Sequence, residues 1–200
     1  GGSKVSTKIN VILSLIQNVN NIIILGAMAN NFLVYKNQKV GKSLVENNVK
    51  EIIKKIYNEA YNNKCQILIP EDFNVSKDFN GKSITKNENN IDSDDIILDI
   101  GPKTLQRVEE IIKTSKTVMW NGPAGYFENI NFAKGTNSLA KIISDYTLKK
   151  SLLSIVGGGD TISAINKSKM SLSFTHLSTA GGAFLEYLEG KDLPGITVLK

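Results

Sequence analysis

The sequence predicts an α/β fold, a doubly wound (Rossmann-like) parallel sheet with helices on both faces. Short apolar runs rich in β-branched residues alternate with stretches of helical periodicity along most of the chain. Such alternation favours parallel strands that helices bury on both sides. Glycine-rich turns follow several of the runs, and ligands in such sheets bind at the carboxyl ends of the strands. We therefore expect a ligand site at this edge.

The elements follow in a regular order. Six runs predict strands, at Asn21–Leu25, Gln66–Ile69, Ile96–Ile100, Thr117–Trp120, Leu152–Val156 and, more weakly, Ser173–Leu177. Four stretches predict helices, at Leu44–Asn62, Thr104–Thr114, Asn131–Tyr146 and Thr161–Lys167. The segment Phe73–Asp95 is polar and asparagine-rich, which indicates a surface hairpin or loop without identifiable chemistry. No repeat or linker interrupts the pattern, so we expect a single domain over residues 1–200.

Composition restricts the class of partner. The net charge is +5, but Arg107 is the only arginine, and the lysines are scattered rather than interleaved with aromatic residues. This disfavours nucleic-acid binding. No apolar run approaches the ~18 residues that span a bilayer, and the start lacks the features of a signal peptide. Cys65 is the only cysteine, which favours a buried structural thiol in a reducing, cytoplasmic compartment.

The most informative stretch is Ser151–Ile165, in which an apolar strand runs into Gly157, Gly158, Gly159 and Asp160 at the start of a helix. Such a junction directs backbone N–H groups and a positive helix end at one point, and therefore favours phosphate binding. Asp160 would cap this helix and could face a bound metal. The alternative is an ordinary tight turn in which Asp160 acts only as the cap.

Three further segments carry a family resemblance. They are T-V-M-W-N-G-P-A-G-Y-F-E at Thr117–Glu128, the opening G-G-S-K-V-S-T-K-I, and the late H-L-S-T-A-G-G-A-F-L-E-Y-L-E-G-K-D-L-P-G. Together with G-G-G-D-T they resemble the C-terminal, nucleotide-binding half of the phosphoglycerate kinase family, and V-G-K-S-L at Val40–Leu44 resembles its bacterial branch. The resemblance implies the C-terminal domain of that fold, ATP or ADP with Mg²⁺, a monomer, and phosphoryl transfer between 1,3-bisphosphoglycerate and ADP in glycolysis.

The resemblance also implies roles for particular residues. Lys4 and Lys8, which would share a face if their segment were helical, correspond to lysines that contact the nucleotide phosphates and the phosphoryl group in transit. Gly181 and Gly182 open a helix aimed at that group, Asp160 holds Mg²⁺, and Glu128 accepts from the ribose. The phosphate turn is Gly157, Gly158, Gly159, Asp160 and Thr161. The base and ribose slot comprises Gly2, Gly26, Ala27, Leu44, Leu98, Asn121, Pro123, Gly125 and Tyr126.

Some positions depart from the family pattern or suggest other chemistry. Leu25, Ala27 and Ala180 stand where the family usually has glycine, so the methyl of Ala27 could narrow the slot. His176 invites a general base, but an acceptor that is already an ionised carboxylate needs none, so we expect a structural role. The two G-K-S triplets lack the first glycine of a P-loop, and no G-x-G-x-x-G follows a strand, which disfavours a dinucleotide oxidoreductase.

In the family, the opening glycines follow an apolar strand, and a preceding half binds phosphoglycerate. We therefore expect a chain that lacks this first strand and that half, with Gly2 and Lys4 on an untethered end.

Two functions stay open. The chain supplies the nucleotide site of a phosphoglycerate kinase and binds 1,3-bisphosphoglycerate or 3-phosphoglycerate only with an N-terminal half, without which it is inactive. Alternatively, it is a non-catalytic nucleotide-binding half-enzyme or a truncated product.

Overall fold

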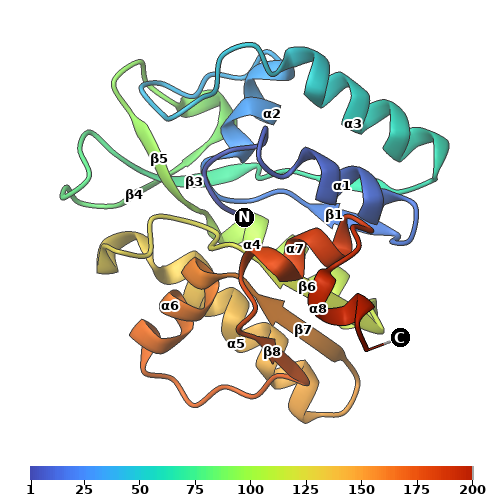
Figure 1. The fold of residues 1–200 in the computed structure, drawn as a ribbon. Coiled ribbons are helices and arrows are strands. Elements are labelled where there is room, and N and C mark those ends of the chain that lie inside the picture. The colour runs from blue at the N-terminus through green and yellow to red at the C-terminus, as the bar shows by residue number, and fades with distance from the viewer. Residues whose placement is uncertain (200) are drawn as a thin grey trace.

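The computed structural model describes residues 1–199 and has an α/β fold with helices on both sides of parallel strands, as the sequence predicts (Figure 1). The strands are β1 (Asn21–Ile23), β2 (Gln66–Leu68), β3 (Asp72–Ser76), β4 (Ile84–Asn87), β5 (Ile96–Ile100), β6 (Thr117–Asn121), β7 (Leu153–Gly157) and β8 (His176–Ser178). The α-helices are α1 (Ile9–Ile16), α2 (Ala29–Tyr35), α3 (Lys50–Asn62), α4 (Pro102–Thr114), α5 (Lys134–Leu148), α6 (Gly159–Ser168), α7 (Gly182–Leu188) and α8 (Pro194–Thr197). Two 3₁₀ turns cover Glu88–Asn90 and Ile130–Phe132.

The parallel strands form two groups. β1 pairs with β2, and β7 lies between β6 and β8. Helices α1 and α3 contact the first group, whereas α5 and α6 pack against β7 (Figure 1). β1 and β6 each have a strand partner on one side only within the described sheets.

The middle of the chain agrees with the sequence predictions only in part. The strand predicted at Ile96–Ile100 forms as β5, but it pairs antiparallel with β3, and β4 pairs antiparallel with the other side of β3. The segment Phe73–Asp95 thus contains a hairpin, as one of the two alternatives had it, but the hairpin is not wholly at the surface, because every residue of β3 is buried. The polar residues of β3 gave no sign of this burial in the sequence. Asp72 can be buried because its carboxylate accepts hydrogen bonds from the N–H groups of Lys103 and Thr104 at the start of α4.

Helix boundaries also differ from the sequence pattern. The predicted helix at Leu44–Asn62 begins only at Lys50, and the preceding residues form an irregular segment. Helix α1 begins only at Ile9. Lys4 and Lys8 therefore lie in a turn before the helix rather than on one helical face.

Two main groups of apolar residues hold the layers together. The first joins α1, α2 and α3 through buried side chains that include Ile12, Phe32 and Ile56. The second packs α4 and α5 against β6 and β7 and includes Trp120. Cys65 belongs to the first group and is buried, as expected for a structural thiol, and this burial raises the pKa of its thiol.

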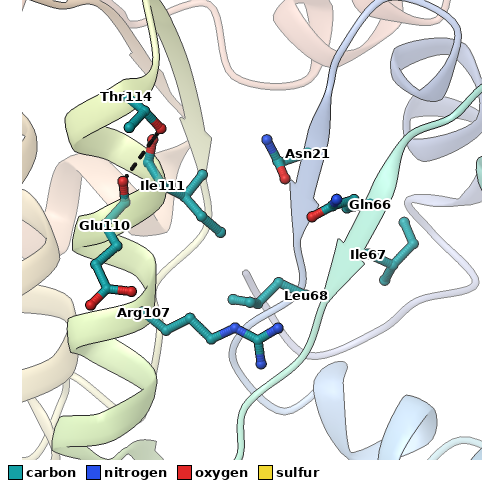
Figure 2. Close-up of a pocket in the computed structure, with 8 residues that line it drawn as sticks. All are labelled: Asn21, Gln66, Ile67, Leu68, Arg107, Glu110, Ile111 and Thr114. Atoms are coloured by element: carbon teal, nitrogen blue, oxygen red, sulfur yellow. Dashed lines mark hydrogen bonds between the residues drawn. The ribbon is translucent and has the colours of Figure 1, made fainter.

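A small cavity of about 250 Å³ lies between α4 and the strands β1 and β2 (Figure 2). Arg107 and Glu110 lie on its helical side, and Leu68 lies on the strand side. None of the helices within residues 1–199 has the length and apolar character needed to cross a membrane.

Candidate functional site

A second cavity, of about 350 Å³, lies where the segments after β1, β2 and β6 meet β5. This volume falls within the ~300–1,000 Å³ of small-molecule pockets. Ten of the predicted site residues line it: Gly2, Gly26, Ala27, Leu44, Leu98, Pro123, Gly125, Tyr126, Glu128 and Asp160. Ala27 therefore forms part of the wall.

Close backbone contacts build one wall. Gly26 has φ +70°, and a Cβ there would lie 2.8 Å from both the nitrogen and the oxygen of Gly2. Gly122 has φ +89°, and a Cβ there would lie 2.3 Å from the oxygen of Gly1. The N–H of Met28 donates to the oxygen of Gly2 at 2.9 Å. The expectation of an untethered end at Gly2 is therefore wrong, because the turns after β1 and β6 hold it from two sides.

Lys8 lies beside this wall, next to Gly2, but does not line the cavity itself. Its Nζ donates to the oxygen of Gly1 and to Oδ1 of Asn121, both at 2.6 Å. Burial lowers the pKa of Lys8, and the nearby carboxylate of Asp160 partly offsets this. The ammonium group thus lies between the end of β6 and the start of α6, where an anion would stabilise its charge.

Asn121 and Thr161 do not line the cavity, but they connect the segments that follow β6 and β7. Nδ2 of Asn121 donates to the oxygen of Gly157 at 3.0 Å, and the N–H of Gly122 donates to Oγ1 of Thr161 at 2.7 Å. The turn after β6 is thereby fixed to the turn after β7. Lys4, in contrast, is exposed and is absent from the cavity wall.

The start of α6 differs from expectation in one detail. Gly158, with φ +99°, occupies the N-cap position, and no side chain caps the helix. Asp160 is therefore not the cap that the sequence suggested but lies in the first helical turn, exposed and on the cavity wall. The first N–H groups of a helix have no intrahelical partner, and beside Gly159 there is open space.

Gly181 and Gly182 begin α7 and do not line the cavity. The ring of Phe184 on this helix lies against Gly157, where a Cβ would meet it at 2.8 Å, so α7 starts near the end of β7. His176 is exposed on β8 and lies outside the cavity wall.

Sequence patterns missed several residues of the wall. Phe79, from the segment expected to lack chemistry, contacts Tyr126 edge to face with ring centroids 5.4 Å apart. Asn30 is 1% exposed, and its Oδ1 has no hydrogen-bond partner among the described residues, while its Nδ2 donates to the oxygen of Leu44. No spacing rule marks Phe79 or Asn30, because the tertiary fold alone brings them to the cavity.

Asp99 is a third missed residue. It is 2% exposed, and its carboxylate accepts hydrogen bonds from the N–H groups of Gly135 and Ile100 at 2.7 and 2.9 Å. Burial raises the pKa of Asp99 to about 7, although these two bonds and Lys134 act in the opposite direction. Its place in the apolar run Ile96–Ile100, two residues before Gly101, was the available signal.

The acidic group Asp92, Asp94 and Asp95 does not line this cavity. Lys77 bridges Asp94 at 2.5 Å and Asp95 at 2.8 Å, and Lys86 bridges Asp92 at 2.6 Å and Asp95 at 2.7 Å. These ion pairs account for the cluster without a ligand.

The family model described as phosphoglycerate kinase matches residues 1–191, nearly the whole chain. This chain belongs to the phosphoglycerate kinase family. Phosphoglycerate kinases of Wolbachia pipientis wMel and Zymomonas mobilis are each 45% identical over all of this chain and 51% of their own length. The chain therefore spans about half the length of the curated relatives it matches.

Solved phosphoglycerate kinase structures support the same family assignment. The enzyme from Coxiella burnetii superimposes with a TM-score of 0.93 at 38% identity, over 100% of this chain and 51% of that one. The enzyme from Pyrococcus horikoshii OT3 gives a TM-score of 0.78 at 29% identity, over 100% and 50%. The recognition made from the sequence motifs is confirmed at the level of the family and the fold.

Proposed function

We propose that this chain is the nucleotide-binding half of a cytoplasmic phosphoglycerate kinase and holds ADP or ATP with Mg²⁺ in the 350 Å³ cavity. The observation that carries the proposal is that an apolar slot and Asp160, at the start of α6, line one cavity, and that the half-buried Lys8 lies beside Gly2 in its wall. An apolar slot suits a base, and a lysine beside unpaired N–H groups suits phosphates.

The residues present fit this ligand. The base would lie between the backbone at Gly26 and the side chains of Leu98 and Tyr126, with Glu128 at the ribose. The exposed carboxylate of Asp160 offers the hard oxygen ligand that Mg²⁺ prefers. When bound there, Mg²⁺ would neutralise charge on the phosphate oxygens.

In the whole enzyme, a carboxylate oxygen of 3-phosphoglycerate would attack the γ-phosphorus of ATP, and the bond to the bridging oxygen of ADP would break. No base is needed, because the acceptor is already ionised. Lys8, and Lys4 once it turns toward the phosphates, would stabilise the charge on the phosphoryl group in transit. Gly181 and Gly182 would add backbone N–H groups at the start of α7. The phosphoglycerate itself would be bound by a separate half of the enzyme.

Calorimetric titration of the 200-residue chain tests the proposal. We expect saturable binding of Mg·ADP and no binding of 3-phosphoglycerate. Gly26→Ala should abolish nucleotide binding, because its Cβ would collide with the backbone of Gly2. Gly190→Ala is a matched control, since Gly190 has a similar φ of +79° with open space around it. Saturable 3-phosphoglycerate binding, or no effect of Gly26→Ala, would contradict the proposal.

A second candidate is a nucleotide-binding half-enzyme without catalytic activity, because the described cavity on its own would suffice for nucleotide binding. A coupled assay distinguishes the two. Restored turnover on addition of an N-terminal half of a phosphoglycerate kinase indicates the enzyme, and nucleotide binding without turnover indicates the non-catalytic module.

A further inference from the structure

Glu46 joins the irregular segment after α2 to the turn that carries both lysines. Its Oε1 accepts hydrogen bonds from the N–H groups of Val5 at 2.5 Å and Ser6 at 3.2 Å, and its Oε2 accepts from the hydroxyl of Ser6. These acceptors come from a residue 40 or more positions away in the sequence. One carboxylate therefore satisfies three donors of the Ser3–Lys8 turn.

This turn has no capping group of its own. Lys8 is the N-cap residue of α1, and no side-chain hydrogen bond caps that helix. The side chain of Val5 is 0% exposed and anchors one end of the turn in the first apolar core. A carboxylate beside consecutive N–H groups forms short, charge-assisted hydrogen bonds, which suit it to fix the turn.

The backbone of the Glu46 segment is fixed independently of its carboxylate. The N–H of Glu46 donates to Oδ1 of Asn31 at 2.7 Å, and Nδ2 of Asn30 donates to the oxygen of Leu44 at 3.0 Å. Both asparagines lie on α2 and are buried. Leu44, on the same segment, lines the cavity. Removal of the carboxylate alone should therefore free the lysine turn and leave the position of Leu44 unchanged.

We propose that Glu46 is a positioning residue that holds the lysine turn in place for the phosphates of a bound nucleotide. The inference rests on the proposed nucleotide site but goes beyond it, because Glu46 does not line the cavity. It acts through Val5 and Ser6, which directly follow Lys4 and lie three and two residues before Lys8. A nucleoside without phosphates would not depend on this contact.

The test compares the affinities of Mg·ADP and adenosine by calorimetry. In Glu46→Ala we expect Mg·ADP to bind roughly tenfold more weakly, the loss typical of one hydrogen bond to a charged group. Adenosine affinity should stay within about twofold of the original, since the slot backbone is held by α2. Glu46→Gln keeps one acceptor oxygen for the two N–H groups and should recover most of the affinity.

Glu51→Ala is the matched control, because it removes an exposed carboxylate on α3 whose one ion pair among residues 1–199 is with Lys54, at 4.0 Å. It should leave both affinities unchanged. If Glu46→Ala does not fold, Ser6→Ala removes a single bond to Oε2 and should weaken Mg·ADP two- to threefold in the same selective manner.

The outcomes separate the two proposals. Equal losses for Mg·ADP and adenosine, or no loss in Glu46→Ala, overturn the role of Glu46 while the nucleotide site stands. Failure of the unmodified chain to bind Mg·ADP overturns both. Selective loss of Mg·ADP affinity with rescue by Glu46→Gln supports the role of Glu46.

Discussion

Asp99 gives the most quantitative prediction. Its carboxyl group lies against the turn that lines the cavity, since a Cβ on Gly125 would meet Oδ1 of Asp99 at 2.3 Å. Burial raises its pKa from 3.8 to about 7. A shift of about three units corresponds to about 4 kcal/mol.

The sign follows from the direction of the shift. A group whose pKa is higher in the folded state contributes stability below its unfolded pKa, and that contribution disappears as the pH rises through the folded pKa. The folded chain should therefore lose up to about 4 kcal/mol of unfolding free energy between pH 4 and 7 through this one carboxyl group.

Asp99→Asn removes the ionisation but leaves one amide oxygen for the two N–H donors, Gly135 and Ile100. At pH 5 we expect the variant to be less stable by about 1–3 kcal/mol, because one buried donor loses its acceptor. As the pH rises to 8 the difference should shrink and change sign, because only the original chain buries a carboxylate.

Urea denaturation, monitored by far-ultraviolet circular dichroism at half-unit steps from pH 5 to 8, measures this difference. Glu51→Gln is the control variant, because it removes an exposed carboxylate in place of the buried one. A difference between Asp99→Asn and the original chain that stays constant over this range would refute the raised pKa of Asp99.

Three further predictions follow from the proposed function. Asp160→Asn should weaken binding of Mg·ADP more than binding of metal-free ADP; equal losses in the two titrations would leave Asp160 with no metal role. In a full-length protein, Lys4→Ala should lower turnover about a hundredfold with little change in the Michaelis constant for ATP, because the charge acts mainly in the transition state. A raised Michaelis constant with unchanged turnover would argue against this. Residues 1–200 alone should form no ATP from 1,3-bisphosphoglycerate in a coupled assay, and sustained formation would show that a separate acceptor half is unnecessary.

Local sequence patterns predicted the parallel part of the fold well. Strands such as β6 and β7 are apolar runs that end in glycine turns, and these two features determine both pairing and the edge at which ligands bind. The hairpin of β3 and β4 was one of the two predicted alternatives, but the burial of β3 was not predicted, because its polar residues are buried by specific partners, such as Asp72 with Thr104. Such pairing depends on tertiary contacts that no local periodicity records.

The candidate site was likewise predicted only where local sequence patterns mark it. Glycines marked the turns of the cavity, because close approach of two backbones excludes any side chain at Gly26 and Gly122. Asn30 and Glu46 carry no such mark, and the only sequence signal at Asp99 is its place in the apolar run of β5. Their roles arise from partners distant in the sequence, and the family motifs do not include them.

The most direct test of the central claim is to locate the nucleotide on the chain. In an amide nuclear magnetic resonance titration of ¹⁵N-labelled residues 1–200 with Mg·ADP, the largest shifts should occur at Gly2, Gly26, Leu98, Gly125 and Gly159. These positions surround the 350 Å³ cavity and the start of α6. Shifts centred instead on Arg107 and Ile111, at the smaller cavity between α4 and β2, would contradict the account.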